Sequence, residues 1–458
     1  MQIATADSLL DALRDSGLFA PAAVEALARA LAPFGDDTQA ALRHLVEHDL
    51  VPVYQLRKVV HRKTADLFVG PFVVLDKLGE GGMGKVFKAR DVRSGRVAAV
   101  KVVRPHLLAN PVVRGRYERE VKAALALRHP NVAAAYEAGE VGGKVYLALE
   151  FVDGIDLSRL VKTFGILPVP EACEYLRQAA LGLAHAHAQG FVHRDIKPGN
   201  FVVAGERHHP EATEPAVVKL LDMGLVRTVG FEEEGPSGTD LTRAGTVLGT
   251  PDYMAPEQAK NSSTADHRAD LYSLGGAFYF LLTGKPPFPV GSPIEKILSH
   301  QHDPPPPLQA ARPDVPDELA RLVARLLAKN PADRPGSAHE VAAALEPLAR
   351  FTADSAAVRF ATPNGVVGPE GVDTGGGGSS QTVPPSSPGE GIDLPRQLAD
   401  ESQCDPDGPP TPPTPILVEL PAREPAEAAG GWRVWAVAAL AALAGVTFGI
   451  LVWAALAR

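Results

Sequence analysis

The loop at residues 193–200 constrains this chain more than any other stretch. It reads His-Arg-Asp-Ile-Lys-Pro-Gly-Asn and follows the helical run 171–189. Asp195 supplies a carboxylate, Lys197 a cation two residues later, and Asn200 an amide five residues after the aspartate. A polar loop with these groups can hold a hydroxyl, a phosphate and a metal ion close together.

This loop resembles the catalytic loop of the protein kinase superfamily, in its serine/threonine branch. The resemblance implies that Asp195 accepts the proton of the substrate hydroxyl, that Asn200 binds Mg²⁺, and that Lys197 steadies the transferring phosphoryl group. It also implies the fold class: α+β, with a β-rich N-lobe and a helical C-lobe. The alternative is a surface loop that holds these residues by chance.

A glycine-rich motif, G-x-G-x-x-G-x-V, begins at Gly79. Glycines let the backbone approach phosphates, with bare N–H groups as donors. Dinucleotide-binding folds use a similar motif, but their loop opens into a helix. Here residues 85–89 and 96–103 look like strands, which favours a β-hairpin covering ATP. The residues expected at the nucleotide are Leu78, Gly79, Glu80, Gly81, Gly82, Met83, Gly84, Lys85 and Val86.

The second of these strands carries Ala99 and Lys101 inside an apolar run. A lysine is costly to bury without an anion. The resemblance implies that Ala99 lies beside the nucleotide, that Lys101 holds the α- and β-phosphates, and that Glu120 in the helical segment 112–127 holds Lys101. Glu118 is the nearby competitor, and a lysine that reaches the surface is the alternative.

Residues 145–151 form an apolar strand that resembles the hinge between kinase lobes. By that resemblance the backbone of Glu150 and Val152 pairs with adenine, and Leu149 lies at the back of the pocket. Asp156 is a candidate for the ribose hydroxyls. A solvated aspartate at a helix start is the other interpretation of Asp156.

Asp222 follows a second apolar run and precedes Met223 and Gly224. This suits a carboxylate aimed at a divalent cation, so Asn200 and Asp222 form the expected magnesium site. The family pattern has phenylalanine where this chain has Met223. The change leaves the metal role intact and puts the packing of the inactive state in question.

The polar stretch after Asp222 ends in Ala-Pro-Glu at residues 255–257, as the activation segment of kinases does. Arg194 directly precedes the catalytic aspartate, and a phosphate on this segment could neutralise it. Thr242 and Thr246 are the expected phosphorylation sites. The alternative is that they are ordinary loop hydroxyls.

Two structural roles follow from the same resemblance. Asp270, at the start of an apolar helix, is expected to brace the backbone of the catalytic loop. Arg334 is expected to pair with Glu257. The kinase domain is predicted over residues 72–348.

Residues 1–66 show apolar residues at helical spacing, broken by Gly and Pro, and predict a module of three or four short helices. A cap at Asp36 or Asp37 is expected for the third helix. The module could support the N-lobe or dock another protein.

Residues 351–431 are rich in Gly and Pro and predict a disordered linker. Residues 351–433 hold 12 acidic and 4 basic residues, a net of −8 of the chain's −9, so the acidity belongs to the linker. Its proline pairs could be a spacer or ligands for an aromatic groove.

The uncharged segment 434–457 predicts a transmembrane helix, because at about 1.5 Å per residue it can cross a core of about 30 Å. Trp432, Trp435 and Trp453 lie at its ends, as in an aromatic belt. The alternative is an Ala-rich soluble helix. Contacts with membrane lipid, a possible homodimer through small residues, and a single-pass membrane protein with a cytoplasmic kinase domain are expected.

The composition carries no clustered basic face, so nucleic-acid binding is not expected. Cys173 and Cys404 lie far apart, without metal-ligand spacing. The predicted function is a membrane-anchored serine/threonine protein kinase that uses ATP and Mg²⁺ on protein substrates. A membrane-tethered pseudokinase scaffold and a small-molecule kinase of related fold are the alternatives.

Overall fold

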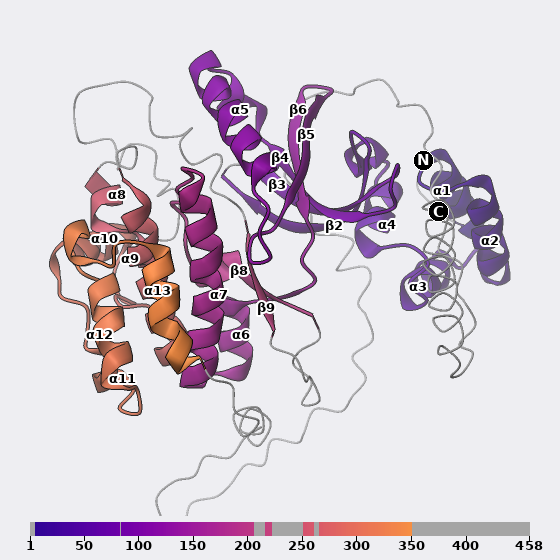
Figure 1. Ribbon diagram of the computed structural model, residues 1–458. Coiled ribbons are helices and arrows are strands. Elements are labelled where there is room, and N and C mark those ends of the chain that lie inside the picture. Colours follow the sequence, from indigo (N-terminus) through magenta and orange to yellow (C-terminus); the bar gives the residue numbers. More distant parts are fainter. Residues whose placement is uncertain (1–4, 83, 206–215, 222–250, 261–264, 350–458) are drawn as a thin grey trace, which may run out of the picture.

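The computed structural model describes residues 5–82, 84–205, 216–221, 251–260 and 265–349. They form two lobes, a sheet with helices beside it and a mainly helical body (Figure 1). None of the helices in these ranges is long and apolar enough to span a bilayer. The predicted linker and the predicted transmembrane segment 434–457 lie outside the described residues.

The N-lobe is built on a six-stranded antiparallel sheet in the order β1-β2-β3-β4-β6-β5. Helix α5 lies beside it (Figure 1). The elements are β1 (Phe68–Val69), β2 (Phe72–Gly81), β3 (Gly84–Asp91), β4 (Val97–Val103), α5 (Pro111–Ala126), β5 (Ala135–Val141) and β6 (Lys144–Glu150). The predicted hairpin and the helix after it are therefore confirmed.

The residues before the sheet form the predicted helical module. Its helices are α1 (Ala6–Asp15), α2 (Pro21–Leu31), α3 (Thr38–Glu47) and α4 (Val53–Val60). Asp37 caps α3 by accepting a hydrogen bond from the Ala40 N–H at 3.0 Å, as expected for one of the two candidate caps.

The module is packed on the sheet rather than standing apart from it. Leu56 and Val59 of α4 share one buried apolar cluster with Val74 of β2 and Val100 of β4. The Gln55 side-chain amide also donates to the Val74 carbonyl at 2.7 Å. These contacts favour the N-lobe support role over a separate docking module.

The sheet has two buried faces. On β6, Tyr146 and Ala148 belong to the cluster shared with the module, whereas Leu147 and Leu149 belong to the cluster that continues into the C-lobe. Successive residues of a strand point to opposite faces. The sheet therefore lies between the N-terminal helices on one side and α5 with the C-lobe on the other.

The C-lobe is organised around α9 (His267–Thr283), which is buried at every position from Ala269 to Leu282, as predicted for a central helix. Asp266 caps its start, and Gly284 at φ +76° ends it in the left-handed conformation that glycine favours. The remaining elements are β7 (Gly154–Asp156), α6 (Leu157–Phe164), α7 (Val169–Ala188), β8 (Phe201–Ala204), β9 (Val217–Leu220), α8 (Pro256–Lys260), α9 (His267–Thr283), α10 (Pro293–His302), α11 (Leu308–Ala311), α12 (Asp317–Leu326) and α13 (Ala338–Leu345).

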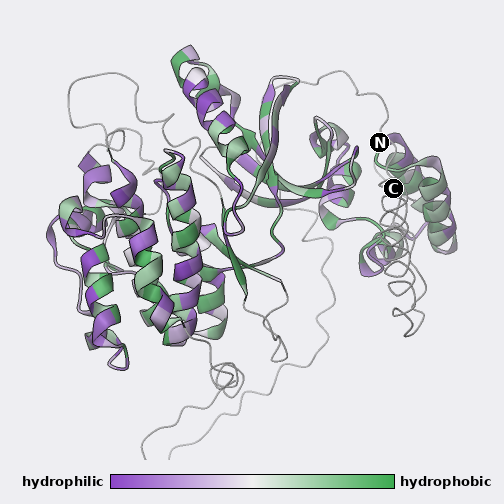
Figure 2. Ribbon diagram, viewed as in Figure 1, coloured by the Kyte–Doolittle hydropathy of each residue, from purple (hydrophilic) through white to green (hydrophobic). Residues whose placement is uncertain are grey.

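Many C-lobe helices are amphipathic, with hydrophilic and hydrophobic residues on the same helix (Figure 2). Strands β7, β8 and β9 form a small antiparallel sheet, and β9 lies against α7. The loop 193–200 leads directly into β8, and β9 ends at Leu220, two residues before Asp222 in the sequence.

Candidate active site

The loop 193–200 brings its three predicted functional side chains together. Lys197 Nζ lies 3.1 Å from Asp195 Oδ2. The Asn200 side-chain amide donates to the Asp195 backbone carbonyl at 2.7 Å and to Oδ2 at 3.3 Å. A carboxylate held in this way keeps a fixed orientation, with a cation beside it, and can accept a proton from a hydroxyl.

The backbone in front of Asp195 is fixed by a buried carboxylate. Asp270, fully buried in α9, accepts the N–H of His193 at 2.8 Å and of Arg194 at 2.7 Å. Burial alone would raise the pKa of Asp270, but a hydrogen bond and the charge of His187, with further contributions from His193, hold that pKa below its usual value. The predicted bracing role of Asp270 is confirmed.

The end of β9 is tied to the same loop. The Leu221 N–H donates to the Asn200 carbonyl at 2.8 Å, and a ring nitrogen of His193 lies 3.0 Å from the Leu221 carbonyl. Leu221 directly precedes Asp222, which lies outside the described residues. The pairing of Asn200 with Asp222 around Mg²⁺ stays a prediction.

Lys101 lies in β4 and is 5% exposed, facing Val86 of β3 and Leu147 of β6 in the strand register. Glu120 lies in α5. The pairing of Lys101 with Glu120 also stays a prediction, while the burial of Lys101 argues against the surface-reaching alternative.

The glycine-rich segment is the turn of the β2–β3 hairpin. Gly81 and Gly84 face each other in the register. Gly84 has φ +152°, and a Cβ there would lie 1.9 Å from the Val102 carbonyl oxygen, so only glycine fits. Hydrogen bonding to Lys77 lowers the pKa of Glu80, which also pairs with Arg104 at 3.1 Å. Met83 lies outside the described residues.

The contacts of the predicted hinge with adenine stay predictions, but the structure shows which backbone groups of Glu150 are already engaged. The Glu150 N–H donates to the Ala134 carbonyl at 2.7 Å, so a contact with adenine at this residue would use its carbonyl oxygen. The Glu150 carboxylate pairs with Lys219 at 2.9 Å. Asp156 caps α6 by accepting the Arg159 N–H at 2.9 Å, as in the helix-start interpretation. Its contact with ribose stays a prediction, as does that of Val152 with adenine.

The end of the predicted activation segment is anchored as expected. Arg334 makes a two-pronged ion pair with Glu257, at 2.6 and 2.8 Å. Gln258, which sequence analysis missed, donates to the Arg194 carbonyl at 3.1 Å and so joins this segment to the catalytic loop. Thr242 and Thr246 lie outside the described residues.

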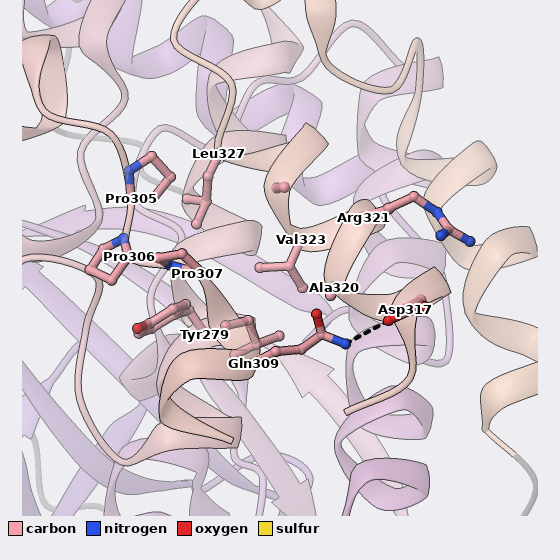
Figure 3. A pocket seen from close by; sticks show the side chains of 12 residues that line it. Tyr279, Pro305, Pro306, Pro307, Gln309, Asp317, Ala320, Arg321, Val323 and Leu327 are labelled. Carbon is pink, nitrogen blue, oxygen red and sulfur yellow. Dashed lines mark hydrogen bonds between the residues drawn. The ribbon is translucent and has the colours of Figure 1, made fainter. Parts of the chain in front are cut away.

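A surface cavity of about 290 Å³ lies elsewhere, between α9, α11 and α12. Figure 3 shows Pro305, Pro306 and Pro307 on one side of it, and the Gln309 amide bonded to Asp317 at 2.8 Å. Among the residues that the structure describes, none of the predicted catalytic or nucleotide residues lines it.

The chain belongs to the protein kinase domain family, whose model matches residues 72–345. It is similar to serine/threonine-protein kinase pkn3 of Myxococcus xanthus, with 40% identity over 297 residues, 64% of this chain and 53% of the relative. It is also similar to serine/threonine-protein kinase PknB of Mycobacterium leprae, with 37% identity over 274 residues, 59% of this chain and 42% of the relative. The match thus spans about half the length of these relatives or less.

The chain is also similar to a crystal structure of the Mycobacterium tuberculosis PknI kinase domain. The alignment covers 61% of this chain and 97% of the PknI chain, at 29% sequence identity and a TM-score of 0.47.

Proposed function

We propose that this chain is a serine/threonine protein kinase, which transfers the γ-phosphoryl group of ATP to hydroxyls of protein substrates. The observation that carries the proposal is the convergence of Lys197 and Asn200 on the carboxylate of Asp195. The family membership and the names of the relatives support it.

The residues fit the nucleotide and its metal ion. Asn200 uses its amide N–H groups on Asp195, which leaves its side-chain oxygen as a ligand for a hard cation such as Mg²⁺. Asp222 would supply the second ligand. Lys101 would hold the phosphates, under the backbone of the hairpin turn that ends at Gly84. Bound Mg²⁺ neutralises charge that develops on the phosphates.

The protein's own groups then carry out the transfer. Asp195 orients the substrate hydroxyl and takes its proton as the oxygen attacks the γ-phosphorus. Lys197, held beside Asp195, stabilises the negative charge on the transferring group. The proton moves to the carboxylate, and the bond to the β–γ bridging oxygen breaks.

The proposal extends to control and location. Phosphorylation of Thr242 or Thr246 by a second copy of the chain would neutralise Arg194 and activate the enzyme. Residues 434–457 would anchor the kinase domain to the cytoplasmic face of a membrane through lipid contacts, and their small residues would allow a homodimer. Sequence features alone support these parts.

The test of catalysis uses the full-length chain, labelled ATP, Mg²⁺ and a generic protein substrate, compared with Asp195→Asn. We expect labelled phosphoserine or phosphothreonine with the wild type and a loss of about 10³-fold or more in the variant, with ATP binding retained. Nucleotide binding without any transfer would favour the pseudokinase alternative. Labelling of small molecules alone would favour a small-molecule kinase of related fold.

The test of anchoring is cell fractionation. The full-length chain should stay with the membrane pellet after alkaline carbonate washing, whereas a chain that ends at residue 433 should be released. Release of both would refute the membrane helix.

A further inference from the structure

A histidine outside the predicted site contacts the residue that braces the catalytic loop. His187, in the last turn of α7, places Nε2 2.8 Å from Asp270 Oδ2. The same oxygen accepts the His193 N–H, and Oδ1 accepts the Arg194 N–H. The Asp270 side chain is fully buried and that of His187 is 9% exposed.

The chemistry of this contact determines which ring nitrogen of His187 carries the hydrogen. An ionised carboxylate has no proton to share, so Nε2 must carry the hydrogen. Nδ1 is then a buried atom with no hydrogen-bond partner among the described residues. A buried polar atom without a partner is costly, so an apolar side chain would suit the packing better. His187 therefore serves at this position as a hydrogen-bond donor to Asp270.

The loop in front of the catalytic carboxylate needs such a brace. Arg194 has φ +63°, in the left-handed region that residues other than glycine rarely adopt. This conformation persists only when surrounding contacts hold it. Asp270 holds it through two N–H groups, and Asp195 is the next residue along the chain.

We propose that His187 is a positioning residue for phosphoryl transfer, which acts by orienting Asp270 and through it the backbone that carries Asp195. This inference rests on the proposed kinase function. It assigns His187 no contact with nucleotide or substrate. A loss of its hydrogen bond should therefore lower the rate of transfer and leave nucleotide binding nearly unchanged.

The test compares four variants of the full-length chain. His187→Phe keeps a ring without donors, and His187→Gln places an amide nitrogen near the position of Nε2. His187→Asn is polar but too short to reach Asp270. His185→Phe is the matched control, because His185 lies two residues earlier on α7 and stacks on His129 at 5.1 Å.

We expect kcat to fall about tenfold in the Phe and Asn variants, which corresponds to loss of one charge-assisted hydrogen bond, with the KM for ATP changed less than about twofold. The Gln variant should recover most of the rate, and the control should match the wild type. Amide hydrogen exchange at His193 and Arg194 should be faster in the Phe and Asn variants only.

An unchanged kcat in the Phe and Asn variants would overturn the proposal. A lower kcat with unchanged hydrogen exchange at the His193 and Arg194 amides would also overturn it. The same holds if the kcat of the Gln variant is no higher than that of the Asn variant. If the Phe variant does not fold, the kcat and the amide exchange of the Gln and Asn variants still test the proposal. A wild type without transfer activity would refute the kinase proposal instead, while the exchange measurement would still report on the brace.

Discussion

Lys219 Nζ lies 2.9 Å from Glu150 Oε1, so an ion pair joins strand β9 of the C-lobe to the end of strand β6 at the predicted hinge. Glu150 Oε2 also accepts the Ala134 N–H at 3.1 Å. Both charged side chains are largely buried. The strand that runs toward the predicted metal ligand Asp222 is thereby fixed to the residue expected to contact adenine.

Replacing Lys219 with Met should therefore weaken nucleotide binding more than catalysis. We expect the KM for ATP to rise about threefold and kcat to change less, because a partly buried ion pair contributes modestly. Steady-state kinetics would measure both. The exposed Lys285→Met is the control. A fall in kcat with an unchanged KM would contradict this role.

The pair of Arg334 with Glu257 should stabilise the C-lobe. Arg334 is buried and makes two hydrogen bonds to the carboxylate. Removal of one partner from such a pair costs about 3 kcal/mol. We expect urea unfolding of Arg334→Met to show a loss of that size. In a double-mutant cycle with Glu257→Gln, additive losses would show that the pair does not interact.

His300 should make the fold sensitive to mild acid. Burial lowers its pKa to about 4, and its Nδ1 lies 2.9 Å from the Tyr272 hydroxyl. In the unfolded chain His300 binds a proton below about pH 6.5, whereas in the native state it stays neutral down to about pH 4. The free energy of unfolding should therefore fall as pH falls through this window, by about 2 kcal/mol at pH 4.5.

The measurement is urea unfolding of the wild type and of His300→Gln between pH 7 and pH 4.5. The variant is less stable at pH 7, where it loses packing, but its stability should fall less across the window. Parallel pH profiles for the two proteins would rule out His300 as the source of the acid sensitivity.

The N-terminal helices should contribute to the stability of the catalytic domain. Leu56 is fully buried in the cluster shared with the sheet. We expect Leu56→Ala to destabilise the whole domain by about 2 to 5 kcal/mol and to lower the temperature at which kinase activity is lost. The exposed Glu25→Ala is the control. Unchanged thermal inactivation of the kinase would restore the docking alternative.

The parts of the site that are contiguous in sequence could be predicted from it, because residue type and spacing carry the chemistry there. The loop around Asp195 and the glycine hairpin are examples. Contacts made across long separations in the chain, such as those of Gln258 with Arg194 and of Lys219 with Glu150, depend on how helices and strands pack. Sequence alone also left two interpretations of Asp156, and its cap on α6 is visible only with a backbone.

The two-sided burial of the N-lobe sheet affects how the protein is made. Helices α1 to α4 emerge from the ribosome before strands β2 to β4, which cover their apolar faces. Until those strands follow, the nascent helices expose leucines such as Leu56 to water. The interval between synthesis of the helices and of the sheet is therefore the stage at which chaperones have apolar surface to bind.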